Sequence, residues 1–317
     1  MTTSSTVIII GGPTASGKSS ISLMLSEILD GIIINGDSMQ VYDQLPILTA
    51  QPTKEDRSKI SHKLYSILKA HETATAAWWR EKALIEIKEA HQQEKTPILV
   101  GGTGFYLKSL EEGLSAIPEI PKDIRDYVRS LSVEDALISL KKADPLTAEK
   151  LFPQDKVRIA RALEVFLATE VSLSTWHQKT STQKPPYAFI RILINPERSV
   201  LKDRANKRFT SMMGQGALDE VEQFLKDPAA RHYLLYKALG VRELDSYLLG
   251  KVSYEEAILR ACISTHQYIK RQQTWFRHQF QPHIIINEFP ELFTRQAFKK
   301  VLKEIDDQLK LVINHHT

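Results

Sequence analysis

An eight-residue segment near the start of the chain has the residue types and spacing of a phosphate-binding loop. It fits the pattern G-x-x-x-x-G-K-[ST], follows a short apolar run and opens a run with helical periodicity. The segment consists of Gly12, Pro13, Thr14, Ala15, Ser16, Gly17, Lys18 and Ser19. Glycines let the backbone approach an oxyanion, and N–H groups at a helix N-terminus favour phosphate. Lys18 adds a positive charge, and the Ser19 hydroxyl is suited to ligate Mg2+ bound to phosphate.

The loop indicates a bound diphosphate group, but it does not by itself indicate ATP. A nucleotide hydrolase of this class normally places an aspartate at the end of a second apolar strand, where it holds magnesium. The best candidate strand here, residues 97–100, runs into Gly101-Gly102-Thr103-Gly104 without an acidic residue. A motor or switch ATPase is therefore disfavoured, whereas a kinase of a small molecule or nucleoside remains open.

Asp37 and Thr103 each follow a predicted strand. Ligands of open α/β sheets sit beyond the carboxyl ends of the strands, so we expect the phosphate loop, Asp37 and Thr103 to meet in one crevice. Beside a diphosphate, the Asp37 carboxylate is suited to accept a proton, and the Thr103 hydroxyl can donate to a phosphate oxygen. A turn-forming or helix-capping role for Asp37 is the alternative that position alone leaves open.

These residues require a sheet that brings strand ends together, and the first 115 residues alternate strand and helix patterns. Short apolar runs separated by helical periodicity predict a parallel sheet with helices on both faces, of the kind that carries a phosphate loop. The predicted strands are residues 6–10, 32–34, 64–68 and 97–100, and the predicted helices are residues 18–29 and 73–93.

A proline-marked helical block interrupts this pattern. Pro118 and Pro121 start it, residues 122–179 are helical in character without a strand, and the segment Ser181–Pro186 ends it. We therefore predict an α/β core of residues 1–120 and 186–317 with a helical insertion of residues 121–185; a few more helices on one core are the alternative. After the block, the sequence predicts a returning strand at residues 188–194, helices at residues 197–213 and 254–280, and a last strand at residues 283–287.

Composition limits the class of protein. The chain has 317 residues, 42% hydrophobic and 25% charged, with a net charge of +4, which permits a polyanionic partner without requiring one. Its one cysteine, Cys262, cannot form an internal disulfide and fits a reducing, cytoplasmic setting. The first apolar run, Val7 to Ile10, is too short for a signal peptide or a membrane span. We expect a cytoplasmic monomer with no membrane association.

Several blocks of the sequence together resemble one family. The string GPTASGKS is followed by NGDSMQVY, by LVGGTGFYLK, by Arg158-Ile159-Ala160-Arg161-Ala162-Leu163-Glu164 and by a late run from Thr265 to Arg277. In this order they resemble the tRNA dimethylallyltransferases, also called tRNA isopentenyltransferases or IPP transferases. With one cysteine, the chain lacks the zinc finger of eukaryotic relatives, so the resemblance is to the bacterial type.

The resemblance implies a reaction. A dimethylallyl group would pass from dimethylallyl diphosphate to N6 of the adenosine just 3′ of the anticodon in tRNA, giving N6-isopentenyladenosine and diphosphate. Asp37 would be the general base and Thr103 would assist the leaving group. The diphosphate would lie on residues 12–19 with Mg2+. Arg204 and Arg208 lie one turn apart on a predicted helix, and one or both would clamp the diphosphate; a solvated basic face is the alternative.

The resemblance also implies a tRNA-binding surface. The target base must leave its stack to reach a buried crevice. The residues expected to contact tRNA are Asp37, Ser38, Met39, Gln40, Thr103, Arg125, Val157, Arg158, Ile159, Ala160 and Arg161. Val157 departs from the family, which usually has glutamine there, and puts one polar contact in doubt. Trp275, between Lys270, Arg271 and Arg277, is an RNA platform or a core aromatic, whereas Trp78 and Trp79 are expected in the core.

Three alternatives accompany this interpretation. A small-molecule or nucleoside kinase would share the phosphate loop and consume ATP without RNA. An isopentenyltransferase acting on free adenine nucleotides would share the early motifs, but the helical block and the basic late run disfavour it. A non-catalytic RNA-binding protein would not need Lys18, Ser19 and Asp37 around one crevice.

Overall fold

The computed structural model describes residues 6–178 and 184–314, and its centre is a six-stranded sheet in which every pairing is parallel. The strand order is β3-β2-β4-β1-β5-β6. The strands are β1 (Thr6–Gly11), β2 (Gly31–Asn35), β3 (His62–Lys63), β4 (Thr96–Gly101), β5 (Ala188–Ile194) and β6 (Ile284–Ile286). The predicted parallel sheet of a phosphate-loop fold is thereby confirmed.

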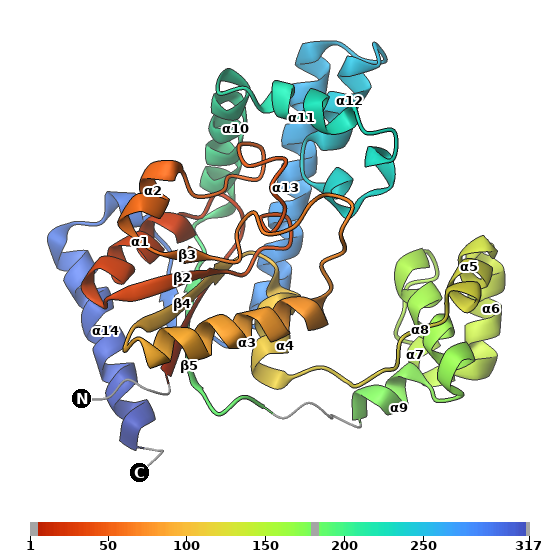
Figure 1. Cartoon of the computed structure of the whole chain (residues 1–317), viewed down its shortest axis with the longest axis horizontal. Coiled ribbons are helices and arrows are strands. Elements are labelled where there is room, and N and C mark those ends of the chain that lie inside the picture. The colour runs from red at the N-terminus through yellow and green to blue at the C-terminus, as the bar shows by residue number, and fades with distance from the viewer. Residues whose placement is uncertain (1–5, 179–183, 315–317) are drawn as a thin grey trace. The chain divides into compact units, whose positions relative to one another are not determined.

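Helices cover both faces of the sheet, because successive side chains of the buried strands point to opposite sides. On one face, Ile8 and Ile10 pack with residues of α1 (Lys18–Ile28) and α14 (Arg295–Asn314). On the other face, Val7 and Ile9 belong to a larger core. That core receives side chains from α3 (Ala76–Gln92), α4 (Gly104–Glu112), α10 (Arg198–Gly214), α11 (Ala217–Leu225), α12 (Val241–Leu248) and α13 (Tyr254–Gln279) (Figure 1).

Short helices complete this part of the chain. They are α2 (Lys54–Lys59) and the 3-10 turns η1 (Ala230–His232), η2 (Leu234–Lys237) and η3 (Pro290–Leu292). The long predicted helix of residues 73–93 begins at Ala76, because the Thr75 side chain accepts a hydrogen bond from the N–H of Trp78 and caps it. No predicted element corresponds to α14.

The predicted strand at residues 64–68 is wrong. Leu64 and Ser66 have φ values of +62° and +54°, which extended strands do not adopt. The strand of this region is the two-residue β3, and the segment after it instead bonds to the loop that follows β2. Ser66 donates its N–H to Gln40 O at 3.1 Å, and Ile67 donates to Val41 O at 2.8 Å.

The chain divides into two compact units, Met1–Glu111 with Pro186–Thr317, and Glu112–Pro185. The second unit consists of α5 (Lys122–Ser130), α6 (Val133–Ala143), α7 (Pro145–Ala148), α8 (Lys156–Thr169) and α9 (Leu173–Gln178). It has its own apolar core, which includes Leu140 and Ile159. Of the predicted closing segment Ser181–Pro186, residues 181–183 lie outside the described part.

The helical unit starts at Glu112, whereas the sequence placed the border at residue 121. The extended residues before α5 explain this difference: Ile120 is 3% exposed, and the Arg125 guanidinium donates a hydrogen bond to the Ile120 carbonyl at 3.2 Å. Within residues 6–178 and 184–314, no helix has the length and apolar character that a bilayer crossing requires.

Candidate functional site

The register of three neighbouring strands brings the predicted site residues to one edge of the sheet. Gly11 at the end of β1 lies opposite Gly101 at the end of β4, and Asn35 at the end of β2 lies opposite Val100. The loops that follow these strands therefore start side by side. Gly36 continues the pairing by donating its N–H to Val100 O at 2.8 Å.

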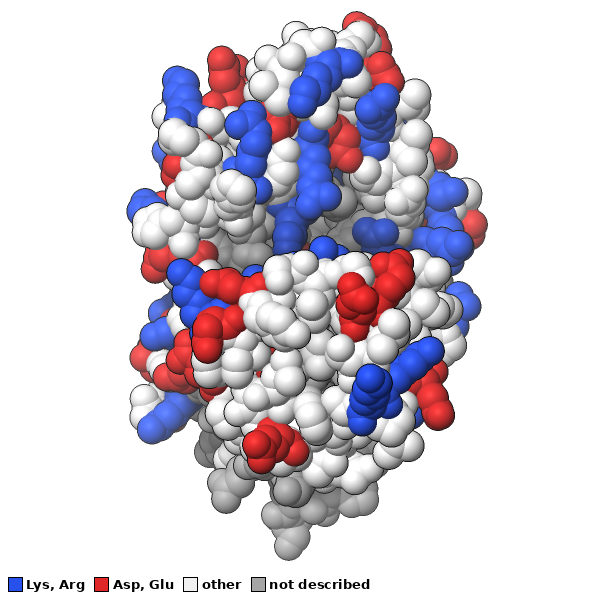
Figure 2. All heavy atoms as spheres, turned by 90° about the vertical axis from the view of Figure 1, so that its right-hand side faces the viewer, with Lys and Arg blue, Asp and Glu red and all other residues white. Residues whose placement is uncertain are grey.

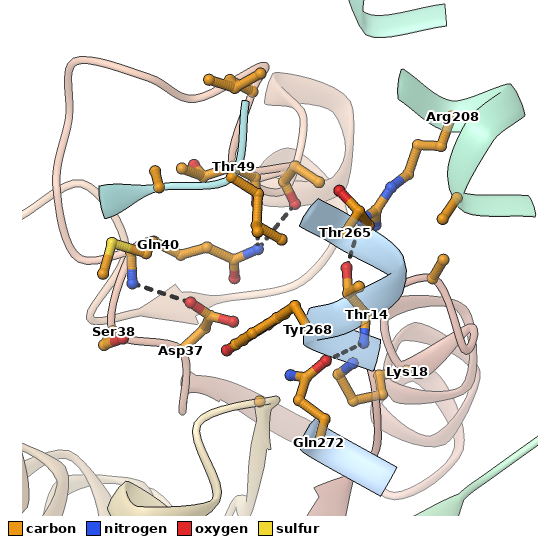
Figure 3. A pocket seen from close by; sticks show the side chains of 18 of the residues that line it. Thr14, Lys18, Asp37, Ser38, Gln40, Thr49, Arg208, Thr265, Tyr268 and Gln272 are labelled. Atoms are coloured by element: carbon orange, nitrogen blue, oxygen red, sulfur yellow. Dashed lines mark hydrogen bonds between the residues drawn. The ribbon is translucent and has the colours of Figure 1, made fainter. Parts of the chain in front are cut away.

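A cavity of about 290 Å3 lies at this edge (Figure 3). Its wall comes from the phosphate loop, the turn after β2, and helices α10 and α13. The lining residues include Thr14, Ala15, Lys18, Ser19, Asp37, Ser38, Met39, Gln40, Arg208, Thr265, Tyr268, Arg271 and Gln272. In Figure 3, Tyr268 lies between Asp37 on one side and Thr14 with Lys18 on the other.

The backbone of the phosphate loop has positive φ values at both of its glycines. Gly12 and Gly17 have φ values of +155° and +93°, and Gly17 begins α1 in the left-handed region. A Cβ on Gly12 would lie 2.4 Å from Ile194 O. Of the predicted loop, Thr14, Ala15, Lys18 and Ser19 face the cavity, whereas Gly12, Pro13, Ser16 and Gly17 shape the turn.

Lys18 lies at the start of α1, with its ammonium beside the loop. The Nζ atom donates to Pro13 O at 2.6 Å. Burial lowers the pKa of Lys18 to about 7; Asp37 opposes this shift by favouring the ammonium, and Arg208 adds to it by repulsion. A bound anion would restore the charged form, so the loop is suited to hold diphosphate.

Asp37 is fixed in a turn directly after β2. Its Oδ1 accepts a hydrogen bond from the N–H of Met39 at 2.9 Å, and its own N–H donates to Asn35 Oδ1 at 2.8 Å. Asn35 is fully buried, and its Nδ2 donates to Asp37 O and to Leu64 O, each at 3.0 Å. The turn-forming role that position suggested is therefore real, and it leaves the Asp37 carboxylate in the cavity wall.

Thr103 holds the turn that carries Asp37. Its Oγ1 accepts a hydrogen bond from the N–H of Ser38 at 3.0 Å and donates to Ser38 Oγ at 3.2 Å. Thr103 does not line the cavity, although Ser38, Met39 and Gln40 do. Both the structure and the sequence therefore place Thr103 near Asp37, but the Thr103 hydroxyl forms its hydrogen bonds with Ser38.

Gln40 connects two walls of the cavity. Its Nε2 donates to Thr49 O at 2.8 Å and to Ala50 O at 3.0 Å, so the turn after β2 is tied to the next loop. Both carbonyls belong to residues of the cavity wall. The amide of Gln40 therefore links the two loops at this side of the cavity.

The two candidate arginines of α10 have different environments. Arg208 lines the cavity, and its Nη2 donates to Thr14 Oγ1 at 2.5 Å. Arg204 instead makes a forked pair with Glu291, with Nη2 and Nη1 at 2.7 Å and 3.1 Å from the two carboxylate oxygens. Between the two predicted clamps, the geometry thus favours Arg208.

The sequence did not identify the contribution of α13. Thr265, Tyr268 and Gln272 face the cavity, and their spacing of three and four residues places them on one side of the helix. The Oε1 atom of Gln272 accepts a hydrogen bond from the N–H of Thr14 at 2.8 Å, and its Nε2 donates one to Gly102 O at 2.9 Å. Burial raises the pKa of Tyr268, and the nearby Asp37 adds to the rise, so its phenol stays protonated. Polar residues on the otherwise apolar face of this helix were the available signal.

The residues predicted to contact tRNA in the helical unit differ in exposure. Arg158 and Arg161 are exposed and weakly paired, with Arg158 3.5 Å from Asp155 and Arg161 3.8 Å from Glu164. Val157 is 79% exposed at the start of α8. Ile159 is fully buried in the core of the unit, so its side chain does not lie on the exposed surface of α8. Ala160 packs against the same core, and Arg125 is partly exposed.

Of the two roles left open for Trp275, the structure supports the core aromatic: the side chain is partly buried and packs against the larger core. Trp275 packs on the backbone of Gly104, where a Cβ would lie 2.1 Å from its ring, and it meets the Phe276 ring edge to face. Trp79 is fully buried, and Trp78 packs against the same core, as expected.

The basic neighbours of Trp275 remain exposed. Figure 2 shows Lys and Arg side chains gathered in the upper part of one face, at the height where Figure 1 places α11 to α13. The exposed basic residues of α12 and α13 include Arg242, Arg260, Lys270 and Arg271.

The arrangement suits a metal ion that is held mainly by a phosphate ligand. Within the described ranges, no group of three or more His, Cys, Asp or Glu is placed to hold a metal. The Ser19 hydroxyl is exposed in the cavity wall next to Lys18, which is where the loop pattern requires a magnesium ligand. These donors fit Mg2+ shared with a diphosphate.

The sequence matches one protein family over most of its length. The family model described as IPP transferase matches residues 40–279. A tRNA dimethylallyltransferase of Zymomonas mobilis is 42% identical over 296 residues, covering 93% of each chain. A tRNA dimethylallyltransferase of Rickettsia massiliae is 39% identical over 304 residues, covering 94% of this chain and 84% of the other.

Solved structures of the same family have the same fold. The full-length tRNA isopentenylpyrophosphate transferase of Bacillus halodurans superposes with a TM-score of 0.73 at 31% identity, covering 98% of this chain and 99% of the other. A eukaryotic dimethylallyltransferase acting on tRNA gives a TM-score of 0.76 at 28% identity, covering 86% of this chain and 70% of the other.

Proposed function

The chain belongs to the IPP transferase family and is a tRNA dimethylallyltransferase, and we propose that its cavity joins dimethylallyl diphosphate to N6 of the adenosine 3′ of the anticodon. The observation that carries this proposal is the presence of Lys18, Arg208 and Asp37 in one cavity wall. Two cations there suit a diphosphate, and a carboxylate suits the proton of an attacking amine.

The phosphate loop binds and orients the leaving group in this proposal. The diphosphate accepts hydrogen bonds from the loop N–H groups, and the charges of Lys18 and Arg208 stabilise it as it departs. Arg208 is pre-positioned because it already donates to Thr14 Oγ1. The Ser19 hydroxyl would hold Mg2+ together with the phosphate oxygens, and the ion would supply further charge stabilisation when bound. The C–O bond of the allylic carbon breaks as positive charge develops on that carbon.

Asp37 serves the attacking base. The exocyclic N6 of adenine is a poor nucleophile because its lone pair is delocalised into the ring. The Asp37 carboxylate accepts the N6 proton as the N–C bond forms, which leaves a neutral secondary amine and diphosphate. The hydrogen bond from the N–H of Met39 holds the carboxylate in place while it does so, and Asn35 Oδ1 accepts the backbone N–H of Asp37.

An apolar wall surrounds the isoprenoid in this proposal. Leu48, Phe209 and Met212 line the cavity together with Ala205, and all four are at most 7% exposed. Such a wall excludes water from an allylic carbon that carries positive charge, so transfer competes well with hydrolysis.

The tRNA requires a larger surface than the cavity. Arg158 and Arg161 of the helical unit, with the exposed basic residues of α13, are suited to bind the phosphates of an anticodon stem. Sequence-independent contacts of this kind position the strand, while the cavity selects the flipped adenosine. A cytoplasmic monomer remains the expectation for an enzyme with this substrate.

One assay tests the proposal. The protein is incubated with labelled dimethylallyl diphosphate, Mg2+ and unmodified tRNA, and the tRNA is digested and searched for prenylated adenosine. We expect label on N6 of the adenosine next to the anticodon. Label on free adenine nucleotides but not on tRNA, or ATP consumption without prenyl transfer, would contradict the proposal.

A further inference from the structure

A short segment after β6 packs on the phosphate loop. It consists of Phe289, Pro290 and Glu291, and it follows residues 40–279, which the family model matches. We call it the 289–291 segment. A Cβ on Gly17 would lie 2.7 Å from Pro290 Cδ and 3.3 Å from a carboxylate oxygen of Glu291. The segment therefore closely contacts the turn at which α1 begins.

The Glu291 carboxylate joins three elements. It accepts hydrogen bonds from both terminal nitrogens of Arg204 on α10, at 2.7 Å and 3.1 Å, and from the hydroxyl of Ser20 on α1. Burial alone would raise the pKa of Glu291, but the hydrogen bonds from Arg204 and Ser20 lower it, so the carboxylate is charged. A bidentate pair of this kind fixes both partners in orientation.

Phe289 holds the same segment in place through a cation–π contact and a small apolar core. The Arg204 guanidinium lies over the Phe289 ring, 4.4 Å from its centre. Phe289 is 7% exposed and shares a small core with Ala15, Leu201, Ala205 and Ile269. Because Ala15 belongs to the phosphate loop and has a φ of +64°, this core supports the loop in a backbone conformation that alanine rarely adopts.

The two arginines of α10 thus hold the loop from two sides. Arg208 donates directly to Thr14 Oγ1, and Arg204, one turn earlier, reaches the start of α1 through Glu291. Loss of the second contact would let the 289–291 segment and the Gly17 turn move away from α10. The N–H groups of the loop and Arg208 would then no longer converge on one anion.

We propose that Glu291 is a positioning residue for the diphosphate, and that its ion pair with Arg204 braces the phosphate loop. The proposal rests on the function proposed above, in which the loop binds the diphosphate of dimethylallyl diphosphate. It assigns Arg204 a structural contact rather than a direct contact with the substrate.

The ion pair between Glu291 and Arg204 predicts a non-additive effect of substitutions that a direct contact of Arg204 with diphosphate would not produce. Paired with Arg204, the Glu291 carboxylate is nearly neutralised beside an anion site. If Arg204 is removed, an unpaired carboxylate remains close to the N-terminus of α1, where it competes with diphosphate for the positive end of the helix. Removal of both charges avoids that repulsion. The two residues are therefore expected to be strongly non-additive.

The test uses the full chain with Glu291→Gln, Arg204→Met and the double variant. We measure the KM for dimethylallyl diphosphate, the KM for tRNA and kcat, and the Kd of inorganic diphosphate with Mg2+ by calorimetry. Glu291→Gln should raise the KM for dimethylallyl diphosphate and the Kd of diphosphate about tenfold, the size expected for one charged hydrogen bond. Arg204→Met should raise both further, and the double variant should bind diphosphate more tightly than Arg204→Met. The KM for tRNA should stay within twofold, whereas kcat should fall, because a displaced loop stabilises the departing diphosphate less well.

A matched control is Asp30→Asn, which removes the charge of an ion pair with Lys95 at 2.7 Å near the other edge of the sheet. It should leave every value unchanged. A direct clamp by Arg204 predicts that Glu291→Gln frees the arginine and lowers the KM, and that the double variant equals Arg204→Met; either result overturns the brace. Unchanged diphosphate binding in Glu291→Gln overturns it as well. Failure of the wild-type protein to bind diphosphate and to prenylate tRNA would instead overturn the proposed function.

Discussion

The side-chain amide of Gln272 accepts the backbone N–H of Thr14 at 2.8 Å, although 258 residues separate the two. The same amide donates to Gly102 O at 2.9 Å. One buried side chain of α13 therefore links the phosphate loop after β1 to the glycine turn after β4. This link fixes the distance between the diphosphate cradle and the turn that contains Thr103.

Gln272→Glu should impair diphosphate binding more than Gln272→Ala does. A carboxylate can still accept the N–H of Thr14, but it faces Gly102 O without a proton to donate and adds negative charge beside the diphosphate. We expect the KM for dimethylallyl diphosphate to rise about tenfold in Gln272→Ala and further in Gln272→Glu. Gln267→Glu, on the exposed side of the same helix, is the matched control. Equal effects at positions 267 and 272 would show that only the added charge matters.

Asp37→Asn should lower kcat by about 10²–10⁴-fold, because an amide cannot accept the N6 proton. The amide oxygen can still accept the N–H of Met39, so the turn should persist. The rate is measured under single-turnover conditions, and tRNA binding is measured by filter retention. We expect tRNA affinity to stay within a few-fold for both Asp37→Asn and Asp37→Ala. A loss of tRNA affinity as large as the loss of rate would mean that Asp37 is mainly structural.

Thr103→Val should lower kcat about tenfold, because Ser38 then loses both its hydrogen bonds to the Thr103 hydroxyl. The Kd of inorganic diphosphate should change less than twofold, since the hydroxyl contacts Ser38 and does not line the cavity. Thr103→Ser restores the hydroxyl and should restore the rate. Weaker diphosphate binding in Thr103→Val would instead support the direct contact with the leaving group that the family resemblance implies.

The sequence was sufficient to predict the part of the site that follows from strand order. A phosphate loop after one strand and an aspartate after another come close if the strands are parallel and near each other in one sheet, and β1 and β2 both pair in parallel with β4, which lies between them. The glycines of the loop were equally predictable, because φ values such as +93° at Gly17 favour glycine.

The rest depends on contacts between distant segments, which periodicity does not reveal. Glu291 reaches the loop through a turn after the last strand, and nothing in its local sequence differs from a solvated acidic residue. Arg204 and Arg208 are equivalent by spacing, and only their contacts distinguish them, with Glu291 for Arg204 and with Thr14 in the cavity wall for Arg208. The error at residues 64–68 has a local cause, since positive φ at Leu64 and Ser66 interrupts an apolar run that reads as a strand.

Gly101→Ala should lower both the stability of the protein and its kcat. A Cβ at this position would lie 2.0 Å from Gly36 O, so the ends of β4 and β2 would have to separate. We expect the free energy of unfolding to fall by about 1–3 kcal/mol, and kcat to fall because Gly36 precedes Asp37. Gly214→Ala is the matched control: it ends α10, and nothing lies within 4 Å of its Cβ. Urea unfolding that shows equal effects for the two variants would contradict the close approach.

The pKa of Lys18, lowered by burial to about 7, predicts how substrate binding depends on pH. Above pH 7 the free enzyme increasingly holds a neutral amine, so the diphosphate must bind together with a proton. We expect kcat/KM for dimethylallyl diphosphate to fall by up to about tenfold per pH unit above 7, as one required proton dictates. The bound diphosphate restores the charge, so kcat should depend less on pH.

The same lowered pKa has a consequence for stability with the opposite sign. Between pH 7 and the ordinary pKa of 10.5, the unfolded chain holds a proton on Lys18 that the folded protein has lost. The contribution of Lys18 to the free energy of unfolding therefore rises with pH over that window, while substrate affinity falls. Lys18→Arg remains charged throughout and should abolish both dependences, whatever its residual activity. A profile of kcat/KM that falls equally in Lys18→Arg would assign the titration to another group.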